Sequence, residues 1–349
     1  MTFDIPAPDE RARGEARERL DGLVKPLGAL GRLEELAAWL CAAHGTVPPR
    51  PLDDVRVVVF AGDHGVSAAS PVSAVSPVSA YPREVTAAMV RVFLSGASGV
   101  NVLARQVGAR VRVLDVAVDG DLTDVPPEVT AHKVRRGSGA IDVADALEPG
   151  EAERGFAAGR AVADEEIDGG ADLLIPGDMG IGNTTVASAL VAACLGLPAE
   201  DVVGAGTGVD ERGRARKVAV VEAALARAGS RAREPFALLT ALGSACAAAT
   251  AGFLVQAAVR GVPVLLDGVF SGAAALVARE IAPEAARWWL AGHRSTEPSQ
   301  AFALKALGLE PILDLGLRLG EGSGAVQAVP VLRAARATLA EMGRLADLA

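Results

Sequence analysis

The sequence predicts an α/β fold with a doubly wound, Rossmann-like parallel sheet. Short Val/Leu/Ile runs alternate with longer helical segments, turns rich in glycine and aspartate follow several of these runs, and no Pro/Ser-rich linker divides the chain. Apolar strands between helices indicate a parallel sheet that is covered on both faces. Ligands bind beyond the C-terminal strand ends of such sheets, so we expect the functional site among these turns.

The expected strands are the short apolar runs bounded by turn residues. They are residues 55–60, 111–118, 172–175, 202–206, 262–267 and 288–291.

The expected helices occupy the longer segments between these runs. Residues 8–44 have charged faces and a stripe of leucines at helical spacing, which predicts helix there. Residues 235–259 contain no charge and are long enough to span a bilayer, but their Ala, Gly, Ser, Thr and Cys content favours a buried helix. Further helices are expected at residues 84–94, 99–106, 151–167, 184–195, 212–228, 236–259, 272–281, 296–307 and 325–342.

Composition excludes several classes of function. A net charge of −9 without a dense Lys/Arg block argues against a nucleic-acid partner. The N-terminus has no apolar segment of the kind found in signal peptides, and we expect no membrane partner. The three cysteines have no CxxC spacing and lie in apolar contexts, so we expect reduced thiols and a cytoplasmic protein.

Residues 173–185 run from an apolar strand through a glycine-rich turn into an alanine-rich helix. The glycines allow backbone N–H groups to approach a ligand, and Asn183, Thr184 and Thr185 can donate hydrogen bonds, which suits a phosphate. Asp178 would repel a phosphate, so it is expected to face a cationic group or one that becomes cationic during a reaction. The alternative is an ordinary capped junction between strand and helix.

A second motif places Glu321 between glycines, just before the last expected helix. The glycines allow a flat ligand to approach, and a carboxylate in an apolar pocket gains the raised pKa that a general base needs. The alternative is that Glu321 only stabilises the dipole of the following helix.

Other polar residues are less specific. The four histidines, at positions 44, 64, 132 and 293, have no metal-ligand spacing, so we expect neither a metal nor another cofactor. Lys217 follows the turn at residues 204–209 and is either part of a solvated face or a phosphate ligand.

A near-duplicated segment, SPVSAV at residues 70–75 and SPVSA at 76–80, predicts an irregular loop near the end of the first strand. The loop is either a lid over the site or a neutral surface expansion.

Nine segments occur together in one order: KPLGALGRLE, AGDHGV, SAYPREVT, GASGVNVLAR, GDMGIGNTT, GTGVD with Lys217, VLLDG, GHRSTEP and LRLGEGSGA. With them the chain resembles the nicotinate-nucleotide:dimethylbenzimidazole phosphoribosyltransferase family over residues 5–342. The chain departs from the family pattern in three places, one of which is the SPVSAV duplication, an insertion beside the implied base pocket. Asp178 stands where Glu is frequent, and residues 242–246 lack the acidic side chain of a Gly-Gly-x-Glu motif.

The resemblance implies transfer of the phosphoribosyl group of nicotinate mononucleotide to 5,6-dimethylbenzimidazole. The products would be nicotinate and α-ribazole 5′-phosphate, the precursor of the lower ligand of cobalamin. One ring nitrogen attacks the anomeric carbon with inversion, and the other must lose its proton. Glu321 is the implied general base, and Asp178 would stabilise an oxocarbenium-like sugar.

The resemblance also implies the remaining site residues. The phosphate and nucleotide would be held by Gly180, Gly182, Asn183, Thr184, Thr185, Gly206, Lys217 and Ser295, and the base by Tyr81, Met89, Leu319 and Gly320.

The implied architecture is a large α/β catalytic domain at residues 51–299 and a smaller helical domain assembled from residues 1–50 and 300–349. The implied assembly is a homodimer. A non-catalytic protein that binds nucleotide or benzimidazole is the alternative function. A pyrophosphate-dependent phosphoribosyltransferase is disfavoured, because residues 262–267 end in one aspartate rather than in paired acidic residues.

Overall fold

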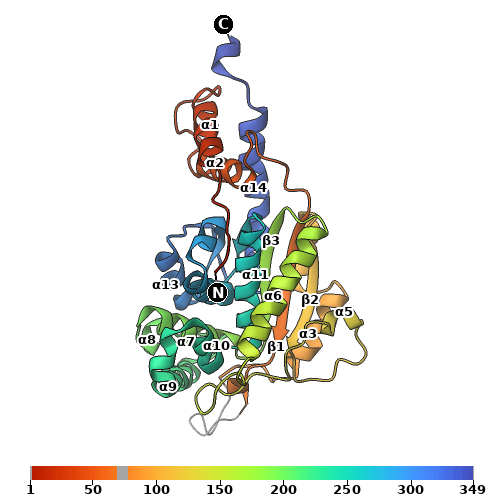
Figure 1. Cartoon of the computed structure of the whole chain (residues 1–349), viewed down its shortest axis with the longest axis vertical. Coiled ribbons are helices and arrows are strands. Elements are labelled where there is room, and N and C mark those ends of the chain that lie inside the picture. The colour runs from red at the N-terminus through yellow and green to blue at the C-terminus, as the bar shows by residue number, and fades with distance from the viewer. Residues whose placement is uncertain (1, 69–77, 349) are drawn as a thin grey trace.

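The structure is a computed structural model that describes residues 2–68 and 78–348. Its centre is a six-stranded, all-parallel sheet with strand order β2-β1-β3-β4-β5-β6 (Figure 1). This confirms the predicted α/β fold with a parallel sheet. The strands are β1 (Val55–Gly62), β2 (Arg110–Ala117), β3 (Leu173–Met179), β4 (Val264–Leu266), β5 (Trp289–Ser295) and β6 (Pro311–Leu317).

The helices connect the strands and extend beyond the sheet. They are α1 (Glu10–Asp21), α2 (Arg32–His44), α3 (Val85–Leu94), α4 (Gly99–Gln106), α5 (Pro127–Thr130), α6 (Glu151–Asp168), α7 (Asn183–Leu195), α8 (Ala199–Val202), α9 (Glu211–Ala228), α10 (Pro235–Leu242), α11 (Ala245–Val259), α12 (Val269–Ile281), α13 (Pro298–Leu307) and α14 (Ser323–Glu341). Short 3₁₀ turns occur at Gly65–Ser67, Gly229–Arg233, Pro283–Trp288 and Leu345–Leu348.

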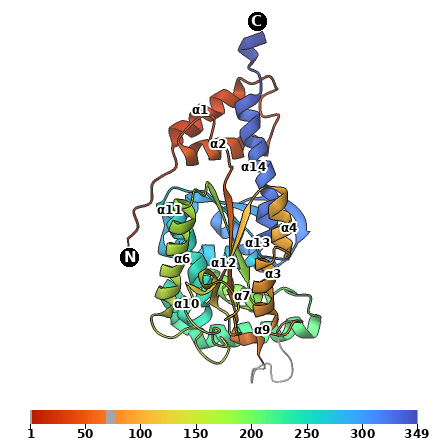
Figure 2. The same ribbon diagram turned by 90° about the vertical axis from the view of Figure 1, so that its right-hand side faces the viewer.

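Helices cover both faces of the sheet, because the strands bury apolar side chains on both sides. In β1, Val58 and Phe60 belong to the apolar core that contains α6, α7, α11 and α12. Val57 and Val59 belong to the opposite core, with α2, α4 and α14. This alternation is the period of two expected of a strand. Figure 2 shows α6 and α3 on opposite sides of the strands.

The two chain ends meet beyond the N-terminal ends of the strands. There α1 and α2 pack against the C-terminal part of α14, and Leu36, Leu332 and Leu339 share one apolar core (Figures 1 and 2). The predicted boundary at residue 300 does not follow this packing. Strand β6 pairs with β5, and α13 packs on β5, so residues 300–317 belong to the sheet layer. The division into two domains remains a prediction.

Three elements differ from the sequence-based expectation. Residues 202–206 form no strand, because Pro198 and two acidic residues begin the short helix α8 and a turn follows it. The single helix expected at 236–259 is two helices, since the chain breaks at Gly243 and the Ser244 side chain caps α11. Strand β6 was not expected, because Pro311, Asp314 and Gly316 interrupt its apolar pattern.

The uncharged segment at residues 235–259 differs from the segment that has the length and composition of a membrane span in the structure. Nearly all of α11 is buried, as expected of a core helix. By length and composition, the stretch Val85–Gln106 is apolar enough to cross a membrane. A non-helical break divides it into α3 and α4, each much shorter than the roughly 20 residues that a bilayer requires.

Candidate active site

Most predicted site residues follow the C-terminal ends of the strands in the chain, at the end of the sheet away from α1 and α2 (Figure 1). The strand order reverses between β1 and β3, since β2 lies on one side of β1 and β3 on the other. In open α/β sheets this reversal creates a crevice beyond the C-terminal strand ends. The turns after β3 and β6 meet at this crevice.

Glu321 lies in the turn between β6 and α14 and is 5% exposed. Its Oε2 accepts a hydrogen bond from the backbone N–H of Val100, at 3.1 Å. Burial raises the pKa of its carboxyl, the Val100 bond lowers it, and the negative charge of Asp267 raises it again, with a net rise. A carboxylate held in this way is a stronger base than an exposed glutamate, which suits it to accept a proton.

The backbone of Glu321 is strained. With φ of 65°, it is the one non-glycine residue among those described that has a positive φ. Such a conformation costs about 1–3 kcal/mol and persists only where the surroundings impose it. The chain also passes so close to β3 that a Cβ at Gly177 would collide with the Glu321 carbonyl. The glycine in β3 therefore allows the turn to rest directly on the sheet.

Asp178 lies near the end of β3 and is 8% exposed. Its Oδ2 accepts a hydrogen bond from the Asn183 side-chain amide. Burial raises the pKa of Asp178 to about 7; the Asn183 bond lowers it, and the charges of Asp267 and Glu321 raise it further. A Cβ at Gly320 would lie 3.6 Å from Asp178 Oδ1, so the turn that carries Glu321 approaches this carboxyl.

The glycine-rich turn leads into α7, as the sequence predicts. Gly182 has a φ of 96° and stands at the helix N-cap position without a side-chain cap. The backbone N–H of Thr184 is satisfied by the Asn183 side chain at 2.8 Å, while the Thr185 hydroxyl is buried without a hydrogen-bond partner. A helix N-terminus with these donors favours an anion.

Lys217 reaches this turn from α9 and is 1% exposed. Its Nζ donates to Thr184 Oγ1 at 3.1 Å and to the Gly204 carbonyl at 3.0 Å. A Cβ at Gly206 would lie 2.8 Å from this Nζ, so Gly206 belongs to the same cluster. Burial lowers the pKa of Lys217 to about 8, while Glu297 raises it and Arg214 lowers it.

Ser295 ends β5 close to this cluster. Its Oγ accepts a hydrogen bond from the Glu297 backbone N–H at 3.2 Å, and the Glu297 side chain accepts one from the Gly206 backbone N–H at 2.7 Å. The structure thus links Ser295 to Gly206 and Lys217 through Glu297. The Asn183 side chain, which donates to Asp178 and accepts from the Thr184 N–H, connects this cluster to Asp178.

The predicted base-binding residues are less closely grouped. Leu319 is exposed and lies against Gly99 at the start of α4, beside the Glu321 carboxylate. Gly320 is in the same turn. Met89 is half-buried on α3, and Tyr81 is exposed at the described end of the duplicated loop. Among the described residues, Tyr81 and Met89 form no hydrogen bond or ion pair with Glu321, so their base-binding role remains a prediction.

Most of the duplicated segment, residues 69–77, lies outside the described residues. Its described end is anchored beside the nucleotide cluster. Ser79 Oγ lies 3.3 Å from Thr207 Oγ1, and the Ala80 N–H donates to the same oxygen at 3.0 Å. Thr207 follows Gly206 directly, so this loop returns next to Lys217.

The sequence did not predict several residues of the crevice as site residues. Glu297 lies within GHRSTEP and Asp267 within VLLDG, so their motifs were visible but their roles were not. Arg318 donates to the Gly206 carbonyl at 2.7 Å and so joins the turn after β6 to the nucleotide cluster. The backbone N–H of Val100 could not have been found from side-chain patterns. Among the described residues, no group of three or more His, Cys, Asp or Glu side chains could hold a metal.

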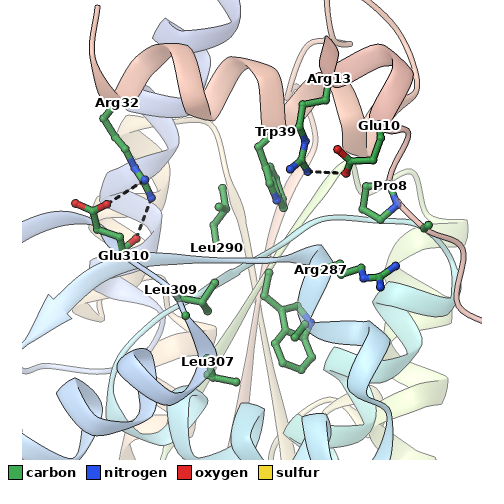
Figure 3. Close-up of a pocket in the computed structure, with 14 residues that line it drawn as sticks. Pro8, Glu10, Arg13, Arg32, Trp39, Arg287, Leu290, Leu307, Leu309 and Glu310 are labelled. Carbon is green, nitrogen blue, oxygen red and sulfur yellow. Dashed lines mark hydrogen bonds and ion pairs between the residues drawn. The ribbon is translucent and has the colours of Figure 1, made fainter. Parts of the chain in front are cut away.

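A cavity of about 710 Å³ lies at the opposite end of the sheet, between the N-terminal helices and β5 (Figure 3). Trp39 projects into it, and two of its arginines pair with acids: Arg13 with Glu10 at 3.5 Å and Arg32 with Glu310 at 3.1 Å. Its lining contains none of the predicted site residues. We therefore place the candidate active site at the C-terminal strand ends, where the predicted residues lie, and not in this cavity.

Replacing Asp178 with Asn should raise stability at alkaline pH and lower turnover. The pKa of Asp178 is raised in the folded state, so its protonated carboxyl contributes to the stability of the fold. This contribution is fully present below the unfolded pKa of about 4 and is lost as the pH rises through about 7. Above that pH the ionised carboxyl costs on the order of a few kcal/mol. Thermal melts of Asp178→Asn at pH 8 and pH 4 should show a higher Tm at pH 8 only. An equal Tm at pH 8 would contradict the buried-charge assignment.

Comparison with known proteins agrees with this geometry. A family model described as phosphoribosyltransferase matches residues 5–348. The chain is 56% identical over 345 residues to the nicotinate-nucleotide–dimethylbenzimidazole phosphoribosyltransferase of Mycolicibacterium paratuberculosis, covering 98% of this chain and 96% of that protein. It is 53% identical to the Mycobacterium tuberculosis protein of the same name, covering 98% of this chain and 92% of that one.

A solved structure has the same fold. The crystal structure of CobT from Thermus thermophilus superimposes with a TM-score of 0.91 at 46% identity, covering 97% of this chain and 98% of that one. Identity of this extent over nearly the whole length, together with the site, settles the family. The chain belongs to the nicotinate-nucleotide–dimethylbenzimidazole phosphoribosyltransferase family.

Proposed function

We propose that this protein transfers the phosphoribosyl group of nicotinate mononucleotide to 5,6-dimethylbenzimidazole, giving α-ribazole 5′-phosphate and nicotinate. The observation that carries the proposal is the buried Glu321, held between glycines in a strained turn against β3, next to Asp178. A nucleotide cluster around Lys217 lies at the same edge of the sheet. The names of the similar proteins supply the substrate pair.

Glu321 acts as the general base. A benzimidazole has two ring nitrogens, and the one that attacks the sugar becomes strongly nucleophilic only if the other gives up its proton. The raised pKa of Glu321 makes its carboxylate a stronger base than an exposed glutamate and so a better acceptor for that proton. Burial of the turn excludes water that would otherwise compete for the sugar.

Asp178 and the nucleotide cluster act on the other substrate. As the bond to nicotinate breaks, positive charge develops on the ribose ring, and an ionised Asp178 stabilises it electrostatically. Lys217, the N-terminus of α7 and the hydroxyl groups of Thr184 and Ser295 hold the 5′-phosphate. The nicotinate ring leaves as a neutralised pyridine, so the reaction needs no acid to protonate the leaving group.

An assay of base exchange tests this proposal. The purified protein is incubated with nicotinate mononucleotide, with and without dimethylbenzimidazole, and nicotinate and nucleotide products are separated by chromatography. The proposal expects nicotinate to appear together with one new nucleotide only when the base is present. Tight binding of the nucleotide without nicotinate release would instead support the non-catalytic alternative.

We also propose that two copies associate through the edge of the sheet at β6. Among the described residues, no strand pairs with the outer side of β6. Leu315 is 60% exposed on this strand, and Leu319 is exposed in the turn that follows. An apolar edge strand left open to water is a liability that proteins usually cover. A second copy is the expected cover, since a homodimer is the implied assembly.

Replacing Leu315 with Lys should therefore convert a dimer to a monomer, measured by light scattering after size-exclusion chromatography. The matched control is Leu27→Lys, which changes another exposed leucine on a different surface. A dimer that survives Leu315→Lys, or a wild-type monomer, would overturn this interface.

The proposed setting is the cytoplasm, with neither nucleic acid nor membrane as a partner. Cys41 and Cys246 support it, because both are buried free thiols and burial raises the pKa of each. Such thiols are inert structural groups rather than disulfide partners.

A further inference from the structure

Asp267 is buried at the end of β4, and its carboxylate accepts three backbone hydrogen bonds. Its Oδ2 accepts from the Gly322 N–H at 3.0 Å, and its Oδ1 accepts from the N–H groups of Gly324 and Ala325, both at 2.9 Å. All three donors lie in the residues directly after Glu321, at the start of α14. The carboxylate therefore ties the end of β4 to the turn that carries the general base.

The hydrogen bonds to Asp267 hold the part of the β6–α14 turn whose backbone is strained. Glu321 and Gly322 have φ values of 65° and 91°, and Gly322 packs so closely on β1 that a Cβ would collide with Val57. Among the described residues, the Glu321 side chain forms one hydrogen bond, from the Val100 N–H. Packing on the sheet and the bonds to Asp267 thus fix the backbone, and the backbone fixes where the Glu321 carboxylate points.

We propose that Asp267 is the positioning residue of this enzyme, which holds Glu321 in its proton-accepting geometry by clamping the backbone of residues 322–325. The inference rests on the proposed function, because it assumes that Glu321 is the base. Asp267 needs no contact with either substrate for this role. Its effect on catalysis is transmitted through the Gly322 hydrogen bond.

Asp267 also sets the charge around Glu321. The charged groups on the elements packed against this turn are Asp178 of β3, Asp267 after β4 and His293 of β5, with Arg318 directed to the Gly206 carbonyl. His293 is buried, and its Nε2 lies 3.3 Å from Asp267 Oδ1. The negative charge of Asp267 contributes to the raised pKa of Glu321. Removing that charge should lower the pKa of the base.

The variant Asp267→Asn separates this role from simple structural support. An asparagine oxygen can still accept from Gly324 and Ala325, but its NH₂ group cannot accept from Gly322. We expect kcat to fall about tenfold to a hundredfold, with the KM for nicotinate mononucleotide within about twofold of wild type, since the nucleotide cluster is untouched. The acid limb of the pH–rate profile should move to lower pH.

Asp172→Asn is the matched control. Asp172 also accepts backbone hydrogen bonds, from the N–H groups of Asp53 and Asp54 at 2.6 and 2.8 Å, but at the opposite end of β3. It should leave kcat and the acid limb unchanged. If Asp267→Asn behaves in the same way, or keeps wild-type kcat, Asp267 is only a structural residue and the proposal is overturned.

Hydrogen–deuterium exchange of the resting protein provides a readout that does not depend on turnover. Faster exchange at the Gly322 amide is expected in Asp267→Asn and not in Asp172→Asn, even if the wild-type protein proves inactive toward dimethylbenzimidazole. Unchanged exchange at Gly322 would overturn the clamp, whereas absence of transfer by the wild type would overturn the proposed function instead.

Asp267→Glu is the second variant if Asp267→Asn does not fold. It keeps the charge but moves the carboxylate by one methylene, so kcat should fall while the acid limb stays in place. Wild-type kcat in Asp267→Glu would overturn the proposal. Failure of both variants to fold would assign Asp267 to folding alone and would also overturn it.

Discussion

Replacing Glu321 with Gln should lower kcat by about 10²–10⁴-fold while leaving the fold intact. Glutamine has nearly the same shape and can still accept the hydrogen bond from the Val100 N–H, but it cannot take a proton from the azole. The KM for nicotinate mononucleotide should change little, because the nucleotide cluster lies on other elements. Steady-state kinetics with circular dichroism as a check of folding measure these effects.

The control for this variant is Glu341→Gln, a substitution of the same chemistry at an exposed position at the end of α14. It should leave kcat unchanged. Near-normal turnover of Glu321→Gln at neutral pH would remove Glu321 from the role of general base.

Replacing Lys217 should mainly weaken binding of the nucleotide. A charge-assisted hydrogen bond contributes about 1.5–3 kcal/mol, so the KM for nicotinate mononucleotide should rise about tenfold to a hundredfold in Lys217→Ala. Lys217→Met is the better packed companion, since it fills the buried site without the charge. Kinetic titration with the nucleotide at saturating base measures the change.

The stability of these variants separates binding from structure. Burial lowers the pKa of Lys217 to about 8, so at pH 7 the side chain remains protonated and its buried charge destabilises the folded protein relative to the unfolded one. Lys217→Met should therefore not lower the Tm at pH 7, and the exposed Lys305→Ala should change neither Tm nor KM. A lower Tm with an unchanged KM in Lys217→Met would make Lys217 a structural residue.

The sequence predicted the sheet well where strands are buried on both faces. The apolar runs at 55–60 and 172–175 correspond to β1 and β3, because central parallel strands require continuous Val, Leu and Ile. The sequence pattern did not predict the edge strand β6, because part of this strand is exposed and it includes Pro311 and Gly316. Register and strand order depend on contacts between distant segments, which no local pattern contains.

The candidate site could likewise be predicted where its residues are neighbours in the sequence, and not where they are brought together by the fold. Glu321 and the glycine-rich turn were visible because unusual residues stand next to each other in the chain. Asp267 and Glu297 were not singled out, because their partners are backbone N–H groups far away in sequence. A buried aspartate after an apolar strand is common. Only the fold shows that this one accepts three N–H groups beside the general base.

The configuration of the product tests the central claim most directly. Nicotinate mononucleotide and dimethylbenzimidazole are incubated with the wild-type protein, and the new nucleotide is examined by ¹H NMR at its anomeric proton. The account predicts an α-configured ribazole 5′-phosphate formed in equal amount with nicotinate, and almost none with Glu321→Gln. A β-configured product, or nicotinate released without consumption of the base, would contradict it.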